Sequence, residues 1–428
     1  MSSILSESFT LPCGVTIKNR IGKAPMTEGL ADLWDNPTPE LARMYRRWAD
    51  GGIGLSVTGN VMVDRRYLER PGNVVLEDER SIDQLRAWAV AGTSNDTQLW
   101  MQISHPGRQS PIYVSRKPVA PSPIKVEMLW VHGQPRALEE NEIQDIIQRF
   151  VRTAEIAKKA GFTGVQLHGA HGYLISEFLS PLVNKRTDQW GGSLENRARF
   201  LLESVRAIRA SVGPDYPISV KLNSSDFQKG GFSEEDSRTV IQWLQQESID
   251  LIELSGGTYE QMAVFDEEGG ATAEGEKVIS AASAKREAYF IDMARKIRQQ
   301  CDVPLMVSGG FRTVEGMEEA VASGVTDLVG LGRPLSSEPN LANHILDGSV
   351  TSARIATKNI ALGKRWFSPA SDNRRIRVLN SFADVGWHAT QIDRMGKGGS
   401  VDWNLSPLSG MLQFFVGGMI KQIKRKEK

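Results

Sequence analysis

The sequence predicts an eight-stranded β/α barrel. Eight short apolar segments alternate with segments of helical periodicity, an alternation typical of a parallel sheet. Eight such units favour closure into a barrel, and 428 residues suit one barrel with an additional segment. The strands are expected at Ile21–Met26, Leu55–Val61, Gln98–Ser104, Gly164–His168, Ile218–Asn223, Leu251–Ser255, Pro304–Gly309 and Asp327–Gly332.

Helices are expected between these strands. An open dinucleotide-binding sheet is the alternative architecture, and it requires a Gly-x-Gly-x-x-Gly turn after an early strand. The sequence has no such turn, so the barrel is preferred. The clearest helical patterns cover Thr38–Asp50, Glu142–Lys159, Glu195–Ala210 and Thr313–Ala322.

The predicted strands have one apolar face and one polar face. Val165 and Leu167 alternate with polar residues, and the strands at 98–104 and 218–223 show the same pattern. Successive side chains point to opposite sides of a strand, so the apolar face suits the helix layer. The polar residues then lie toward the carboxyl end of each strand, where the catalytic residues of β/α barrels are found.

Three segments lie outside this repeat. A hairpin at Phe9–Asn19 is expected to close the bottom of the barrel. The long connections Pro106–Ala137 and Gly256–Glu287 are expected to be lids or binding loops, because compact domains seldom contain long loops without a function. We predict a barrel domain at residues 1–345 and a C-terminal extension at 346–428.

The composition excludes several classes of protein. Cys13 and Cys301 are the only cysteines, too few for a disulfide framework, an iron–sulfur cluster or a cysteine-based zinc site. This usage fits a reducing compartment, and the N-terminus lacks the pattern of a signal peptide. A cytoplasmic location is therefore expected. The expected partners are a small-molecule substrate and no nucleic acid, and a homo-oligomer remains open.

The extension is basic. From Thr351 to Lys428 the chain has 14 Lys and Arg but 5 Asp and Glu, so the rest of this neutral protein is acidic. One interpretation of its last segment is a basic amphipathic helix on an anionic membrane. The preferred interpretation is a helix docked on the acidic barrel or on a neighbouring subunit, because Gly417 and Gly418 weaken an independent helix. The apolar residues at helical spacing are Leu412, Phe415, Val416, Met419, Ile420 and Ile423.

The strongest local signal follows the fourth strand. His168, His171 and Tyr173 stand together there, at the predicted mouth of the barrel. Two imidazoles can both donate hydrogen bonds to one substrate oxygen, and a phenol can deliver a proton. A satisfied core histidine is the usual interpretation of a lone His, but this cluster favours a catalytic site. His-x-x-His supplies only two zinc ligands, so a metal site is disfavoured.

The second signal follows the last two strands. Gly309 and Gly310 stand in one turn, and Gly332 precedes Arg333 in the next. Glycines let backbone N–H groups approach a phosphate, and an arginine can bind its oxygens in a fork. Phosphate sites after strands seven and eight recur in β/α barrels, which favours this interpretation over ordinary tight turns.

The region from Phe9 to about Pro339 resembles the old yellow enzyme family of NAD(P)H:flavin oxidoreductases. This resemblance implies non-covalently bound FMN across the barrel mouth, with NADPH or NADH as the reductant. The motifs that carry it are Ala24–Thr27, Thr58–Gly59, Gln102, His168–Tyr173, Asn184–Asp188, Gly191–Arg197 and Gly330–Arg333.

The resemblance also implies roles for individual residues. Pro25, Met26 and Thr27 would border the isoalloxazine ring, with Thr27 bonded to a ring carbonyl. Gly59 and Gln102 would contact the pyrimidine side. The remaining cofactor residues would be Lys221, beside the ring, and Gly309, Gly310, Gly332 and Arg333, around the phosphate.

Lys221 stands where most members of the family have arginine. A buried cation needs an anionic partner, and the reduced flavin would supply one. Members that reduce dienoyl thioesters carry a four-cysteine cluster and a second dinucleotide-binding domain. This chain has neither, so electrons are expected directly from the nicotinamide.

The expected function is the reduction of α,β-unsaturated carbonyls by an FMN-dependent, ping-pong NAD(P)H oxidoreductase. His168 and His171 would bind the acceptor oxygen, and Tyr173 would protonate the α-carbon. One alternative keeps the flavin but passes electrons to quinones or dioxygen. Another is a flavin-binding scaffold without catalytic activity.

Overall fold

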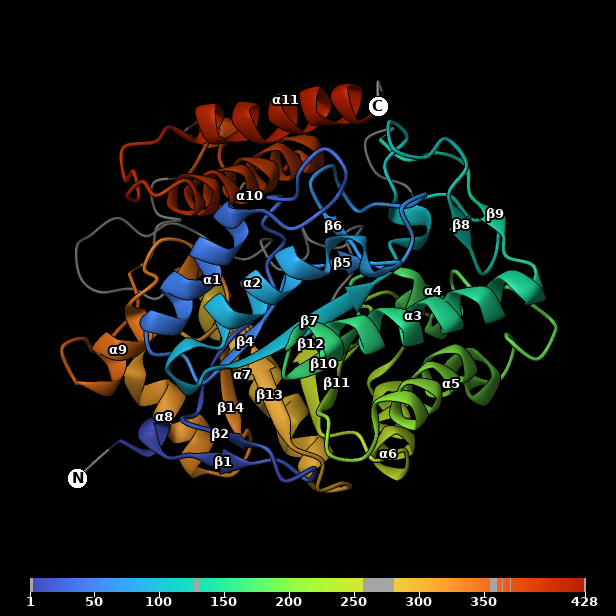
Figure 1. The fold of residues 1–428 in the computed structure, drawn as a ribbon, viewed down its shortest axis with the longest axis horizontal. Coiled ribbons are helices and arrows are strands. Elements are labelled where there is room, and N and C mark those ends of the chain that lie inside the picture. Colours follow the sequence, from blue (N-terminus) through green and yellow to red (C-terminus); the bar gives the residue numbers. More distant parts are fainter. Residues whose placement is uncertain are drawn as a thin grey trace.

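The structure, a computed structural model, describes residues 3–126, 131–256, 281–354, 360–363, 365–369 and 371–426. Its centre is a closed barrel of eight parallel strands, because β10 pairs with both β11 and β7 and so joins the two ends of the sheet (Figure 1). The predicted fold class is confirmed. The barrel strands are β3 (Ile21–Lys23), β4 (Leu55–Val57), β7 (Gln98–Ser104), β10 (Gly164–Gly169), β11 (Ile218–Asn223), β12 (Leu251–Ser255), β13 (Leu305–Ser308) and β14 (Leu328–Leu331).

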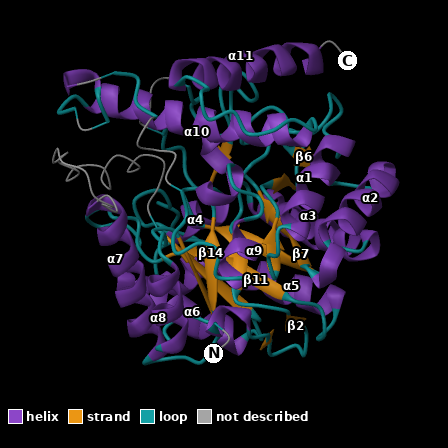
Figure 2. Cartoon of the chain, turned by 90° about the vertical axis from the view of Figure 1, so that its left-hand side faces the viewer, coloured by secondary structure: helices purple, strands orange, loops and turns teal. Residues whose placement is uncertain are grey.

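A helix follows each barrel strand, and Figure 2 shows these helices around the strands. Local signals set their ends: Thr38 caps the first helix, whose first residue is Pro39, and Gly161 ends the third with φ of 97°. The four predicted helices are confirmed. The helices are α1 (Pro39–Asp50), α2 (Ile82–Gly92), α3 (Glu140–Ala160), α5 (Leu194–Val212), α6 (Glu234–Gln246), α7 (Ala281–Arg298), α8 (Val314–Ala322) and α9 (Leu341–Leu346).

The predicted N-terminal hairpin is confirmed, and it closes the bottom of the barrel. Strands β1 (Phe9–Thr10) and β2 (Thr16–Ile17) pair antiparallel. Leu11 and Ile17 pack against Trp100 and other apolar side chains inside the barrel. Smaller elements are β5 (Val61–Met62), β6 (Val74–Val75), α4 (Leu174–Leu179), η1 (Ile4–Ser6), η2 (Glu79–Ser81), η3 (Ser94–Asp96), η7 (Arg333–Ser336) and η9 (Arg365–Phe367).

The structure describes most of one of the two predicted long connections, and only the ends of the other. The connection at Pro106–Ala137 contains η4 (Gly107–Gln109) and the paired strands β8 (Val119–Ala120) and β9 (Arg136–Ala137). Most of the connection predicted at Gly256–Glu287 lies outside the described residues. Its predicted end is wrong, because α7 already begins at Ala281.

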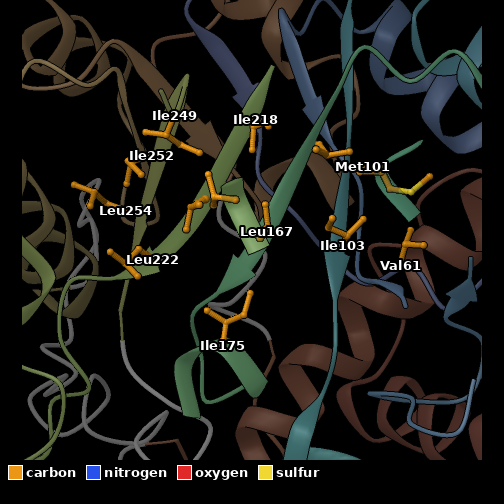
Figure 3. Close-up of a cluster of buried hydrophobic side chains, with 14 of the residues drawn as sticks. Val61, Met101, Ile103, Leu167, Ile175, Ile218, Leu222, Ile249, Ile252 and Leu254 are labelled. Carbon is orange, nitrogen blue, oxygen red and sulfur yellow. The ribbon is translucent and has the colours of Figure 1, made fainter. Parts of the chain in front are cut away.

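The apolar face of the strands points outward to the helices, as predicted. Leu167, Ile103, Leu222 and Leu254 all belong to one large buried cluster (Figure 3). The inward face is apolar near the hairpin and polar toward the carboxyl ends of the strands. The barrel therefore presents its polar side chains at the mouth, the end opposite to the hairpin.

The C-terminal extension lies at this mouth end (Figures 1 and 2). Helix α10 (Arg374–Gly396) packs on α1, and α11 (Pro407–Lys426) packs on α10. Arg43 and Arg47 of α1 donate hydrogen bonds to backbone oxygens at the end of α10. Within the part of the chain that the structure describes, every helix is too short or too polar to span a bilayer. The domain boundary at residue 345 stays a prediction.

Candidate active site

The structure brings His168, His171 and Tyr173 together at the mouth. His168 lies on β10, His171 and Tyr173 follow it, and the tyrosine is fully buried. Nε2 of His168 lies 3.0 Å from Nδ1 of His171, and the rings of His168 and Tyr173 are 4.7 Å apart at their centroids. Two imidazoles and a phenol therefore lie side by side, in an arrangement that suits the binding and protonation of a carbonyl compound.

A hydrogen-bond chain sets the orientation of both imidazoles. The amide nitrogen of Asn60 donates to Glu69 at 2.7 Å, so the amide oxygen faces Nδ1 of His168, also at 2.7 Å. An amide oxygen only accepts, so Nδ1 of His168 carries the proton and Nε2 accepts from His171. Nε2 of His171 then accepts from the Ser255 hydroxyl at 2.7 Å. In the hydrogen bond between the two imidazoles, His171 is therefore the donor and His168 is the acceptor.

These donor and acceptor roles affect the prediction that both imidazoles donate to one substrate oxygen. Two neutral imidazoles have one N–H each. Donation from both requires His168 to carry its proton on Nε2, and hence the amide of Asn60 to turn. The joint donation by His168 and His171 stays a prediction, whereas donation by His171 needs no such change.

Both imidazoles are neutral at physiological pH. Burial lowers the pKa of His171 to about 3, and the nearby Lys221 cation adds to the effect. Burial, then His171 and Lys221, lowers the pKa of His168 well below its usual value. Neutral imidazoles polarise a bound carbonyl by hydrogen bonding and do not protonate it.

The backbone of His171 is held in an unfavourable conformation. Its φ is 62°, in the left-handed region that residues with a side chain rarely adopt. Two side chains hold it: Asn223 accepts from the His171 N–H at 3.2 Å, and Gln109 donates to its carbonyl at 2.7 Å. Strain of this kind persists only where neighbours over-determine it, and it is frequent at active sites.

A polar layer crosses the barrel beneath the histidines. Gln102 donates to Gln166 at 2.8 Å, and Gln166 donates to the Glu253 carboxylate at 2.9 Å. The other oxygen of that carboxylate accepts from Lys221 at 2.8 Å. Glu253, on the adjacent strand, therefore already supplies an anionic partner for Lys221, and the place of Lys221 beside the flavin stays a prediction.

The segments after β3 and β4 approach each other closely. Pro25, Met26 and Thr27 are half-buried, and the Thr27 hydroxyl donates to Glu69 at 2.8 Å. A Cβ on Gly59 would lie 2.4 Å from the Met26 carbonyl oxygen, so only glycine permits this approach. Thr27 and Gly59 also border a narrow crevice that reaches Trp88 of α2, too small to hold a ring. The chain thus provides a close-packed wall at the place predicted for the ring.

The predicted phosphate turns follow β13 and β14. Gly309 and Gly310 have φ of 105° and 89°, which favour glycine. A Cβ on Gly332 would meet no atom within 4 Å, so its turn faces open space. Arg333 is 42% exposed, and its guanidinium lies 2.9 Å from the Asp384 carboxylate of α10.

FMN fits this set of groups. Two open glycine turns and a partly exposed arginine suit a phosphate, and the half-buried segment after β3 suits a flat apolar ring. In that case Gly309, Gly310, Gly332 and Arg333 would hold the phosphate. Asp384 would be a neighbour that the sequence did not predict.

A larger cavity, of about 210 Å³, lies between the loop after β5 and the start of α3. Arg66, Tyr67 and Glu142 are among the residues that line it. No predicted site residue is among them. We place the site at the mouth, because the polar ends of the barrel strands meet there.

Sequence reasoning missed several residues that the structure adds to the site. Asn223 and Ser255 are the last residues of β11 and β12, and polar residues at strand ends were a visible signal. Glu253 also lay on a predicted strand. Asn60 and Glu69 had no local signal, because their place depends on how loops from two strands meet.

The barrel and its mouth define a flavin-dependent oxidoreductase, and comparisons agree. A model of the NADH:flavin oxidoreductase / NADH oxidase family matches residues 9–351. NADH-dependent flavin oxidoreductase iliE of Hypocrea jecorina is 38% identical over 364 residues, which are 80% of this chain and 88% of that protein. The chain belongs to this family, which includes the old yellow enzymes.

Solved structures show the same fold. An old yellow enzyme homologue from Zymomonas mobilis superposes with a TM-score of 0.68 and 26% identity, over 82% of this chain and 94% of that one. A 2-naphthoyl-CoA reductase complex gives a TM-score of 0.74 and 27% identity, over 82% of this chain but 53% of that longer chain. The protein is therefore an enzyme with FMN as cofactor and NADH or NADPH as reductant, not a non-catalytic scaffold.

Proposed function

We propose that the enzyme reduces α,β-unsaturated carbonyl compounds in a ping-pong reaction. The observation that carries this proposal is the cluster of buried His168 and Tyr173 with half-buried His171 at the mouth. It combines a hydrogen-bond donor for a carbonyl oxygen with a proton donor close by. Transfer of electrons to quinones or dioxygen alone does not require a positioned phenol.

The chemistry that bound FMN supplies is hydride transfer, from NADH or NADPH to an acceptor. The residues of the chain bind and protonate that acceptor. Nδ1 of His171 donates to the carbonyl oxygen, which takes the place of His168 Nε2 as its partner. This bond draws electron density from the alkene and favours hydride addition at the β-carbon.

Tyr173 completes the reduction by giving its phenolic proton to the α-carbon. Burial excludes bulk water, so the alkene carbon depends on a proton donor within the site. Ser255 and Asn60 act through the histidines, because each fixes the orientation of one ring.

Steady-state turnover of the FMN-loaded enzyme tests the proposal. We expect oxidation of NADH or NADPH that depends on an enone such as cyclohexenone and yields the saturated ketone. Parallel assays use a quinone, and dioxygen alone. If the enzyme turns over these acceptors but not the enone, the proposed substrate class is overturned, whereas the assignment as an oxidoreductase still holds.

A further inference from the structure

Helix α11 is fixed to the mouth loops by one face. Arg425 forms an ion pair with buried Asp35, at 2.8 Å, and Lys421 donates to the Gly29 carbonyl at 3.1 Å. The Arg70 guanidinium lies 3.9 Å from the centroid of the Phe414 ring. The body therefore holds the helix in one orientation, despite the two glycines that weaken it.

The opposite face of α11 is exposed and apolar. Six large side chains form a stripe along the helix, each between 46% and 58% exposed. Their spacing of three or four residues puts them on one face. They are Leu408, Leu412, Val416, Met419, Ile420 and Ile423. A contiguous apolar surface of this kind marks a contact with another molecule or a membrane.

The charges of α11 indicate an anionic partner. Residues Pro407–Lys426 include no Asp or Glu, and four cations lie in the last turns. Lys421 and Arg425 face the body, whereas Lys424 is exposed beside Ile423. The partner must therefore accept an apolar stripe with a positive charge at one end.

A second copy of the chain fits this face poorly. A stable protein interface uses about 20–30 residues from each partner, and one stripe of six provides far fewer. A membrane surface requires only one amphipathic helix with basic residues, and anionic lipids supply the opposite charge. In both views α11 is the outermost element at its end of the molecule, so a flat surface can reach it (Figures 1 and 2).

We propose that α11 docks this protein on the surface of an anionic lipid bilayer. The stripe enters the boundary between headgroups and acyl chains, and Lys424 lies among anionic headgroups. Because the inner face is already fixed to the barrel, binding does not have to fold the helix. The proposal does not rest on the acceptor that the enzyme reduces.

Vesicle flotation with the FMN-loaded, full-length protein tests the proposal. We expect flotation with vesicles of phosphatidylcholine and phosphatidylserine, release at high salt, and little flotation with phosphatidylcholine alone. The double substitution Leu412→Gln, Ile423→Gln should reduce the bound fraction more than tenfold (~0.8 kcal/mol per CH₂ removed from lipid). Lys424→Glu should reduce it about tenfold. The matched control is Val90→Gln on α2, which alters a side chain that is 72% exposed and should leave binding unchanged.

Bound flavin and near-ultraviolet circular dichroism verify that each variant is folded. The proposal is overturned if the wild type does not float with anionic vesicles, or if the double variant floats equally well. Light scattering after gel filtration measures the oligomeric state and so tests the alternative partner, a second copy of the chain. A dimer that the double substitution dissociates, with no lipid binding by the wild type, would assign the stripe to a second copy.

Discussion

At the scale of single residues, Tyr173 separates the two halves of the reaction. In the proposed reaction, the phenol protonates the alkene acceptor but has no part in hydride transfer from the nicotinamide. We predict that Tyr173→Phe retains FMN and its reduction by NADPH or NADH, but slows enone reduction roughly 10²–10⁴-fold, the usual effect of a positioned general acid. Stopped-flow measurement of each half-reaction tests this.

A quinone is the matched acceptor for this test, because its oxygens can take protons from water. Its reduction should survive in the variant. Equal loss of both half-reactions would mean that Tyr173 shapes the site beside His168 instead of donating a proton. An unchanged rate with the enone would require a different proton donor.

Lys221 carries a second prediction, on stability. Lys221→Met leaves the Glu253 carboxylate fully buried without its cation. We expect a loss of about 3–5 kcal/mol in the free energy of unfolding, measured by urea denaturation. Adding Glu253→Gln removes the uncompensated charge and should restore most of the lost free energy of unfolding. If the double variant is as unstable as Lys221→Met, the loss comes from packing and not from charge.

Comparison of this double variant with Glu253→Gln alone tests the predicted place of Lys221 beside the flavin. A cation near the ring stabilises the negative charge of the reduced form. Its removal should therefore lower the midpoint potential of bound FMN. An unchanged potential would show that Lys221 serves only the polar layer with Glu253.

At the scale of elements, the ion pair between Arg333 of η7 and Asp384 of α10 leads to a prediction about FMN binding. Removing a charge-assisted fork to a phosphate costs on the order of 2–3 kcal/mol, so Arg333→Ala should weaken FMN binding about 30- to 150-fold. Titration of the apoprotein with FMN, followed by flavin fluorescence, measures this. Arg375→Ala is the control, because Arg375 is exposed on the same extension.

Asp384→Ala distinguishes two roles of Arg333. If the guanidinium holds the phosphate, this variant should keep most of its FMN affinity. If Arg333 only anchors α10, both variants should lose stability alike, and neither should lose affinity for FMN.

The elements that could be predicted from the sequence are those whose environment imposes a periodic pattern of apolar and polar residues. Barrel strands separate a helix layer from a polar interior, so apolar and polar residues alternate along them. Helix α10 was not predicted, because it packs on α1 and also carries α11, which spreads its apolar residues around the helix. Pairs such as Arg333 with Asp384 leave no pattern at either position, since only the tertiary fold brings them together.

At the scale of the whole molecule, the lowered pKa values of His105, His168 and His171 make stability depend on pH. Burial lowers the pKa of His105 to about 4 and of His171 to about 3, and also lowers that of His168. An unfolded histidine titrates near 6.5, so below that pH the unfolded chain binds protons that the folded chain does not. The free energy of unfolding should therefore fall by about 1.4 kcal/mol per pH unit for each histidine between pH 6.5 and 4.

His105→Gln should reduce this pH dependence by about one third, measured by urea denaturation at pH 7 and pH 5. His344→Gln is the matched control, because His344 is exposed. Carboxylates other than the neighbouring Asp64 titrate alike in all three proteins, so the difference between variants isolates His105 together with Asp64. Identical slopes in His105→Gln and the wild type would refute the prediction.

The contact of α11 with the barrel also bears on how the protein is made. Arg425 lies 390 positions after its partner Asp35, nearly the full length of the chain. During synthesis the N-terminal segment emerges first, and the barrel strands leave the ribosome long before α11 exists. The loops after β3 and β5 must therefore wait for α11 to reach them. The mouth of the barrel is completed only after α11 has been translated.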